Sequence, residues 1–477
     1  MTSTMTGSVT NAADQQDLRD NMFPVDREIE VDQCEVEGEI PPGLRGMFVR
    51  NGPNPMFEPI GKYHMFDGDG MLHGVAFADG KASYRNRWIR SRGLQAEVKL
   101  GRAAYPGLSD VMNFPSPDLV GDAGPVKNPA NTHIVRHAVR LLALWEQGLP
   151  TEIAPDLGTV GEWDFAGELK GAMTAHPRID PRTGEMFFFA YNFFPPFLVY
   201  YVVDAAGKLI KRVELDLPAP IMMHDMLITE DYSVFMDSPI VFDMEALSTG
   251  GSMVQWKQEN GTRIGVMPRM GDADSIRWFE VPTSHVQHFW NAWQDGNRVE
   301  ITGCRFEQVD FGIETEASDK ESGIGEAGGV PARYWVDLDS GDAGSEFFDD
   351  EMGEFCRIND DYTGIKSDKL YMSGFTRPGA RGGDFDTIVK YDQATDTRTK
   401  WYSGDSGHIG ENVFAPDPDG SAEDDGWIVN SSHDSATGQS EVLVLDARDI
   451  EAGPIARVQV PQRMPFGFHA NWFPASE

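Results

Sequence analysis

The sequence predicts an all-β protein, specifically a β-propeller, and three observations carry this prediction. Short runs of β-branched and aromatic residues recur in pairs around Gly, Asp and Asn turns, from about residue 40 to the end of the chain. Glycine and proline together supply 80 of the 477 residues, a content that suits a protein with many turns. No capped stretch of about 12 or more residues shows clear 3.6-residue periodicity, so long helices are expected to be few.

Five β-hairpins can be assigned by residue range. The paired runs are 71–77 with 82–89, 197–203 with 208–215, 290–293 with 298–304, 388–391 with 398–402, and 426–430 with 441–445. An all-β chain of this length must protect its sheet edges, and radial repetition in a propeller does so within one domain. Separate sandwiches would need linkers, and no Pro/Ser-rich linker interrupts the pattern.

We therefore expect residues 25–477 to form one propeller domain, preceded by a polar, mobile tail at residues 1–24. The stretch 101–129 is loop-like but carries apolar residues, which suits the mouth of an apolar pocket. The acidic, glycine-rich segment 311–331 is expected to be a long surface loop.

Charge and composition exclude several classes of function. The chain has 76 acidic and 40 basic residues, for a net charge of −36, which disfavours nucleic acid and anionic membrane surfaces as partners. Neither a secretory signal nor a transmembrane segment is expected, because Asn192 and Pro195–Pro196 interrupt the longest apolar stretch. Peripheral membrane contact stays open. The three cysteines are too scattered for a disulfide framework or a cysteine zinc site, which favours a reducing cytoplasm.

Four of the eleven histidines lie in settings typical of buried strand ends. They are Thr-Ala-His176-Pro, Met-Met-His224-Asp, His288-Phe-Trp-Asn and Gly-Phe-His469-Ala. Imidazole is the commonest side-chain ligand for iron, zinc and copper. No HxH or HxxxH spacing links any two of them, so the residues alone leave two alternatives open, a metal site and ordinary buried histidines.

A series of motifs then runs in order along the chain. They are Gly-Glu-Ile-Pro-Pro-Gly-Leu-Arg-Gly at 38–46, Arg50-Asn-Gly-Pro-Asn-Pro, Phe66-Asp-Gly-Asp-Gly-Met-Leu-His73, Asn131-Thr132, Leu142-Ala-Leu-Trp-Glu146, Ala175-His176-Pro, His224-Asp, His288-x-Trp-Asn-Ala-Trp, Glu354-Phe-Cys-Arg-Ile-Asn, Gly410-Glu411-Asn-Val-Phe-Ala-Pro and Pro465-Phe-Gly-Phe-His469. In this order and spacing, the chain resembles the carotenoid cleavage oxygenase family from about residue 38 to its end.

The resemblance implies a seven-bladed propeller, with loops and short helices as a cap over its top face. It also implies one Fe(II) per chain on the propeller axis. The four implied ligands are His176, His224, His288 and His469. Three glutamates are implied to accept hydrogen bonds from ligand histidines, Glu146, Glu354 and Glu411, which would fix the imidazole tautomers. Thr132 matches a position beside an open site on the iron.

The implied reaction splits a C=C bond with O2 and gives two carbonyl products. The favoured substrate is a carotenoid or apocarotenoid, because Trp145 stands where the stilbene-cleaving branch has a lysine that meets a phenol. The alternative on the same fold is cleavage of a stilbene or phenylpropene of lignostilbene or isoeugenol type. A non-redox hydrolase or binding scaffold is a remote alternative, since a central calcium would need oxygen ligands. Aromatic residues available to line a tunnel are 187–189, Phe193, Phe194, Phe289, Trp290 and Phe466.

Overall fold

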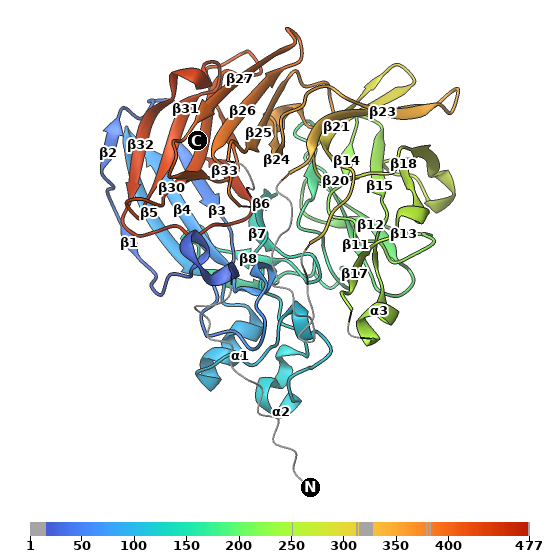
Figure 1. The fold of residues 1–477 in the computed structure, drawn as a ribbon, viewed down its shortest axis with the longest axis horizontal. Coiled ribbons are helices and arrows are strands. Elements are labelled where there is room, and N and C mark those ends of the chain that lie inside the picture. The colour runs from blue at the N-terminus through green and yellow to red at the C-terminus, as the bar shows by residue number, and fades with distance from the viewer. Residues whose placement is uncertain are drawn as a thin grey trace.

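Seven antiparallel sheets surround one axis in the computed structural model, which confirms the seven-bladed propeller (Figure 1). The structure describes residues 16–249, 251–311, 313, 328–377, 380 and 383–475. Residues 1–15 of the expected tail, and most of the expected surface loop at 311–331, lie outside these ranges.

The blades follow the chain in order. Blade 1 holds β1 (Glu30–Val31), β3 (Gly46–Arg50), β4 (Met71–Ala78), β5 (Lys81–Trp88) and β33 (Ala470–Pro474). Blade 2 holds β6 (His133–His137), β7 (Arg140–Leu144), β8 (Thr151–Ile153) and β9 (Thr159–Glu162). Blade 3 holds β10 (Arg178–Ile179), β11 (Met186–Tyr191), β12 (Leu198–Val203) and β13 (Leu209–Leu215). Blade 4 holds β14 (Leu227–Ile228), β15 (Tyr232–Asp237), β18 (Thr262–Pro268) and β19 (Arg277–Val281).

Blade 5 holds β20 (His285–Asp295), β21 (Arg298–Phe306), β22 (Val330–Asp337) and β23 (Ala343–Phe347). Blade 6 holds β24 (Gly353–Arg357), β25 (Lys369–Gly374), β26 (Thr387–Asp392) and β27 (Thr397–Tyr402). Blade 7 holds β2 (Val36–Gly38), β28 (Gly407–Ile409), β29 (Val413–Pro416), β30 (Gly426–Asp434), β31 (Gln439–Asp446) and β32 (Pro454–Val460). A separate two-stranded sheet pairs β16 (Ile240–Phe242) with β17 (Val254–Trp256).

Helices among the described residues are short. The α-helices are α1 (Arg92–Leu100), α2 (Pro117–Val120) and α3 (Met244–Ser248). The 3-10 turns are η2 (Gln16–Leu18), η3 (Asp20–Met22), η4 (Met65–Asp67), η5 (Leu108–Asp110), η6 (Gly121–Ala123), η7 (Gln258–Asn260), η8 (Ala273–Ser275), η9 (Asp360–Tyr362) and η10 (Ile450–Ala452). No helix in the described ranges is long and apolar enough to cross a membrane.

All five predicted hairpins are confirmed as strand pairs: β4–β5, β12–β13, β20–β21, β26–β27 and β30–β31. The apolar stretch around β11 and β12 illustrates why these strands form. Both strands are buried on both faces, because each blade packs between two neighbours. Alternate side chains therefore enter different cores, with Phe187 and Phe189 in one cluster and Phe188 in the other.

Strands from the two ends of the chain close the ring. Near the N-terminus, β2 adds to the outer edge of blade 7 by pairing with β32. At the C-terminus, β33 becomes the first strand of blade 1 by pairing with β3, with Phe48 opposite Trp472. The last blade and the first blade thus each contain a strand from the other end of the chain, which leaves no open gap in the ring.

The stretch before blade 2 forms the expected cap. Helices α1 and α2 lie together on one side of the propeller, at the bottom of Figure 1. Ser91 caps the start of helix α1, because its hydroxyl accepts the Leu94 N–H, and Gly101 caps the end with φ 69°. Lys127 fixes the cap by contacting Asp69 at 2.9 Å and Glu97 of α1 at 3.1 Å, all largely buried.

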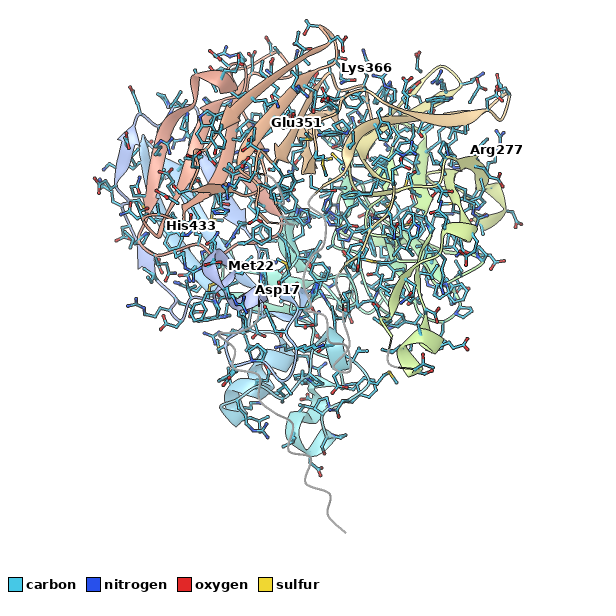
Figure 2. All side chains as sticks on the ribbon, viewed as in Figure 1. Asp17, Met22, Arg277, Glu351, Lys366 and His433 are labelled. Atoms are coloured by element: carbon cyan, nitrogen blue, oxygen red, sulfur yellow. The ribbon has the colours of Figure 1, made fainter. Side chains whose placement is uncertain are left out.

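The described part of the expected mobile tail differs from that expectation. Residues 16–24 pack against the propeller, and Asp17 and Met22 are labelled near its centre in Figure 2. The Asp17 carboxylate accepts the Met65 N–H at 2.8 Å, Leu18 is buried, and Met22 contacts an apolar cluster. A buried hydrogen bond and apolar contacts order these residues, so the polar composition of the segment was misleading.

Candidate metal centre

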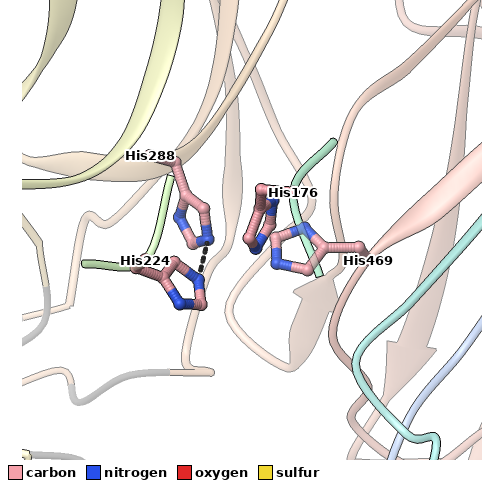
Figure 3. Close-up of side chains that lie close together, drawn as sticks. All are labelled: His176, His224, His288 and His469. Atoms are coloured by element: carbon pink, nitrogen blue, oxygen red, sulfur yellow. Dashed lines mark hydrogen bonds between the residues drawn. The ribbon is translucent and has the colours of Figure 1, made fainter. Parts of the chain in front are cut away.

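Four histidines converge at the axis of the propeller. One ligand atom from each of His176, His224, His288 and His469 lies within 4.8 Å of the others, and Figure 3 shows the rings facing a common point. Each histidine lies in or just before the first strand of a blade: β10 of blade 3, β14 of blade 4, β20 of blade 5 and β33 of blade 1. Several first strands of adjacent blades contact one another, such as β14 with β20 and β33 with β6, which brings residues far apart in sequence together.

The remaining first strands supply other expected site residues. Glu354 lies in β24 of blade 6, Glu411 follows β28 of blade 7, and Thr132 immediately precedes β6 of blade 2. Glu146 follows β7 of blade 2, one strand further out. Histidines and carboxylates therefore occupy successive blades around one ring.

Carboxylates face three of the imidazoles on their Nδ1 side. His288 Nδ1 hydrogen-bonds Glu354 Oε2, which also accepts the Phe355 N–H at 2.6 Å. His469 Nδ1 lies 3.0 Å from Glu411 Oε1, while Glu411 Oε2 accepts the Ala470 N–H at 2.7 Å. The third contact is longer, with His224 Nδ1 lying 3.3 Å from Glu146 Oε1. A carboxylate in this position fixes the Nδ1–H tautomer and leaves the Nε2 lone pair for a metal.

The Nε2 atoms provide a direct test of whether a cation fits. His224 Nε2 and His288 Nε2 lie 3.0 Å apart (dashed line in Figure 3). With each Nδ1 proton directed at a carboxylate, two lone pairs would face each other at that separation. In addition, His176 Nε2 is buried without a hydrogen-bond partner in the described part of the chain. A cation among the rings would satisfy all these atoms, so the residues fit a metal ion.

The pKa values of three of the four imidazoles suit the same role. Burial, followed by repulsion from neighbouring cationic forms, lowers the pKa of His176, His224 and His469 well below the usual value, so these rings are neutral. Burial also lowers the pKa of His288, but the Glu354 carboxylate outweighs this and raises it. Burial raises the pKa of Glu146 to about 8, an effect that the nearby Ala175 N–H and Tyr191 hydroxyl partly offset.

A strained backbone position supports the Glu354 contact. Phe355 has φ 56°, in the left-handed region, where β24 departs from regular pairing with β25. Such a conformation costs on the order of 1–3 kcal/mol and persists where the surroundings enforce it. Here the Phe355 ring packs against His288 and His469, with centroid distances of 5.8 and 5.2 Å. The irregularity thus places the Glu354 carboxylate on His288 and the Phe355 ring on both His288 and His469.

An ion pair that sequence reasoning missed connects three of the histidine-bearing blades. Arg178 pairs with Asp225, the residue after His224, and donates to the Met226 carbonyl at 2.7 Å and the Phe289 carbonyl at 3.2 Å. Asp225 in turn accepts the Phe289 N–H at 3.0 Å. The sequence does offer a signal for this pair: Arg178 lies two positions after His176, and Asp225 directly follows His224.

His133 is a second residue whose role the sequence did not reveal. It lies outside the four-histidine cluster, as expected, but its ring packs against His176 and His469. His133 Nδ1 donates to the Ala175 carbonyl at 2.8 Å, and His133 Nε2 accepts from Asn471 at 3.1 Å. These bonds hold the residues next to His176 and His469 in place.

An apolar cavity of about 350 Å³ opens onto the histidines, within the usual size range for ligand sites. Its lining includes Thr132, Trp145, His224, His288 and His469. The backbone carbonyl of Thr132 also accepts the His469 N–H at 3.1 Å. The stretch 101–129 contributes many lining residues, which confirms the expectation of an apolar mouth there.

The expected tunnel aromatics need a partial correction. Phe193 and Phe466 line the cavity. Phe187–Phe189, Phe289 and Trp290 instead belong to the cores between blades, and Phe194 is largely exposed. Other aromatic residues take their place: Phe57, Tyr63, Phe66, Tyr105, Phe114, Trp145, Tyr191, Phe242, Phe306, Phe311, Phe355, Phe385 and Phe468. Several come from loops between blades, where strand patterns give no signal.

Fold and site together define a propeller enzyme with a histidine-rich centre, and comparison with known proteins identifies its family. The model of the retinal pigment epithelial membrane protein family matches residues 22–474. A Crocus sativus carotenoid 9,10(9',10')-cleavage dioxygenase is 34% identical over 470 residues, covering 91% of this chain and 84% of that protein.

Solved structures support the same family assignment. The Pseudomonas brassicacearum lignostilbene dioxygenase superposes with a TM-score of 0.89 at 31% identity, covering 97% of this chain and 99% of the other. A cobalt-substituted Synechocystis apocarotenoid oxygenase superposes with a TM-score of 0.80 at 28% identity, covering 95% and 97%. The chain belongs to the carotenoid cleavage oxygenase family. It is therefore an enzyme of the non-haem dioxygenase class.

The first prediction concerns metal binding. Replacing His176, His224, His288 or His469 by alanine is expected to abolish tight metal binding, because each removes one of four converging lone pairs. Metal content per chain, measured by elemental analysis, provides the test. His408→Ala is the matched control, since His408 lies on β28 beside Arg377, outside the cluster. Full metal occupancy in two of the four variants would refute this ligand set.

The second prediction concerns the carboxylates. Glu146→Gln, Glu354→Gln and Glu411→Gln are each expected to lower metal affinity or activity by roughly 10- to 100-fold while the fold persists. Competition with a chelator measures the affinity, and circular dichroism checks the fold. Glu441→Gln is the control, because Glu441 pairs with Arg457 in blade 7. Unchanged metal affinity and activity in all three variants would show that the glutamates do not support the metal ligands.

Proposed function

We propose that the protein is an Fe(II)-dependent dioxygenase that cleaves a C=C bond of a carotenoid or apocarotenoid with O2. The products are two carbonyl compounds, so both oxygen atoms of O2 are accounted for and no other reductant is required. The observation that carries this proposal is the four-imidazole cluster at the end of an apolar cavity. Its one iron per chain would be held by His176, His224, His288 and His469.

The chemistry of the four imidazole ligands supports iron as the metal. Imidazole suits iron, and four neutral ligands leave the full charge of a divalent ion in place. Glu354 and Glu411 offset that charge from behind the imidazoles and orient the rings, and the Glu146 carboxyl lies behind His224. When bound, ferrous iron supplies reactivity toward O2 without a haem, a flavin or a nicotinamide.

The chain itself binds and orients the alkene. The mostly apolar cavity removes the polyene from water, which contributes roughly 25 cal/mol per Å² of buried apolar surface. Thr132 lines this cavity, and its backbone carbonyl accepts a hydrogen bond from the His469 N–H, so the residue lies beside the centre. We infer that Thr132 restricts how O2 and the alkene approach the iron.

Trp145 supports the choice of a polyene. Its indole lines the cavity directly before Glu146, at the position where a lysine would meet a phenol. An indole cannot act as a charged partner to a phenol or a phenolate. The carotenoid-cleaving dioxygenases of plants match this chain at 33–34% identity, which points to the same class of substrate.

One observation favours the alternative substrate class of stilbenes and phenylpropenes. The superposition with the lignostilbene dioxygenase has a TM-score of 0.89, whereas the superpositions with the apocarotenoid oxygenase reach 0.82. Backbone similarity reports mainly on the scaffold, while substrate choice depends on side chains in the cavity. We therefore give more weight to Trp145.

The third prediction concerns substrate choice. The kcat/KM for a carotenoid or apocarotenal is expected to exceed that for resveratrol or isoeugenol by at least about tenfold, or ~1.4 kcal/mol. The physical reason is that the phenol hydroxyl loses its hydrogen bonds to water in this cavity, and the Trp145 indole does not provide a suitable hydrogen-bonding or charged partner in return. Steady-state oxygen consumption with each substrate measures the ratio.

Trp145→Lys is expected to raise phenolic turnover slightly without improving the polyene reaction, and Trp145→Phe is the matched apolar control. Rapid cleavage of the hydroxystilbene, with no reaction on any polyene, would assign the enzyme to the stilbene-cleaving class. The assignment of the metal ligands would then still stand.

A further inference from the structure

Gln287 is a polar residue in the cavity that the reaction so far does not use. It lines the same cavity as its neighbour His288. In a regular strand, adjacent side chains point to opposite faces. Here β20 bulges, because its pairing with β21 passes from Val286 opposite Arg305 to Phe289 opposite Gly303. Two residues thus oppose one, and the bulge lets both Gln287 and His288 reach the cavity.

Two side chains behind Gln287 fix the orientation of its amide. Gln287 Oε1 lies 2.8 Å from His285 Nε2, and His285 Nδ1 lies 3.0 Å from Ser238 Oγ. Because the amide oxygen faces Nε2, the Nε2–H donates to it, and Nδ1 accepts the Ser238 hydroxyl proton. Burial lowers the pKa of His285 to about 4, which is consistent with a neutral ring that donates at one nitrogen and accepts at the other.

The amide nitrogen of Gln287 is then left as a donor. Its oxygen is engaged by His285, and no acceptor for its N–H groups occurs within the described part of the chain. Two other charged groups of the cavity are already paired: Glu354 with His288, and Lys127 with Asp69 and Glu97. A few fixed polar groups in a mostly apolar pocket orient a ligand and provide its specificity.

We propose that Gln287 is a specificity-determining residue that donates a hydrogen bond to a hydroxyl or carbonyl oxygen of the alkene substrate. The enzyme would then prefer an oxygenated apocarotenoid to a hydrocarbon polyene of the same length. This inference rests on the proposed alkene-cleaving function and deepens it.

Binding without turnover provides the test. Under anaerobic conditions, quenching of tryptophan fluorescence measures the Kd for an apocarotenal and for the hydrocarbon polyene of equal length. The wild-type protein is expected to bind the aldehyde about 3- to 10-fold more tightly, the contribution of one hydrogen bond. Gln287→Met removes the donor, and Gln287→Glu keeps an acceptor for His285 but loses the amide N–H. Both variants are expected to bring the ratio of the two Kd values close to one.

Gln147→Met is the matched control. Gln147 also lines the cavity, but its amide donates to the Tyr191 carbonyl at 3.5 Å, so the ratio should stay at the wild-type value. A second substrate pair, hydroxystilbene with stilbene, applies the same test to the alternative substrate class. An unchanged ratio in both Gln287 variants, or no preference in the wild type, would overturn the role of Gln287 and leave the function standing. Failure of the wild type to bind any of the four alkenes would overturn both.

Discussion

The pairing of β33 with β3 is the interaction on which the rest of the structure depends. This pairing places the C-terminal segment on the axis, and His469 immediately precedes β33. The other three histidines come from blades 3, 4 and 5, so the cluster is complete only when the ring has closed. Closing the propeller and assembling the proposed iron site are therefore one event, and binding of a metal would stabilise the closed ring by mass action.

Charge is distributed around the centre in a consistent way. Four imidazoles face inward, and carboxylates lie behind three of them, where they orient the rings. The Arg178–Asp225 pair then ties blades 3, 4 and 5 to one another. Removing one partner of such a buried pair leaves an uncompensated charge, so the loss of either residue is expected to disturb the geometry of the histidines. Gln287 adds a neutral donor on the cavity side of the same blades.

Local patterns predicted much of this fold, and nonlocal contacts explain the rest. The hairpins followed from turn chemistry between β-branched runs, as at β4–β5 and β30–β31. The blade count and the grouping of the four histidines came from family resemblance, because no short spacing links His176 to His469. The Phe187–Phe189 run was placed near the tunnel but packs between blades. The bulge that turns Gln287 into the cavity leaves no sequence pattern, and polar composition concealed the packing of residues 16–24.

In the proposed site, one ferrous iron is bound by four imidazoles and by no other protein group. X-ray absorption spectroscopy at the iron K-edge, on purified protein loaded with Fe(II), tests this most directly. Four-imidazole coordination predicts multiple-scattering features of four imidazole rings per iron, with nitrogen and oxygen neighbours only. A spectrum fitted by two imidazoles or fewer, or one that requires sulfur ligands, would contradict it.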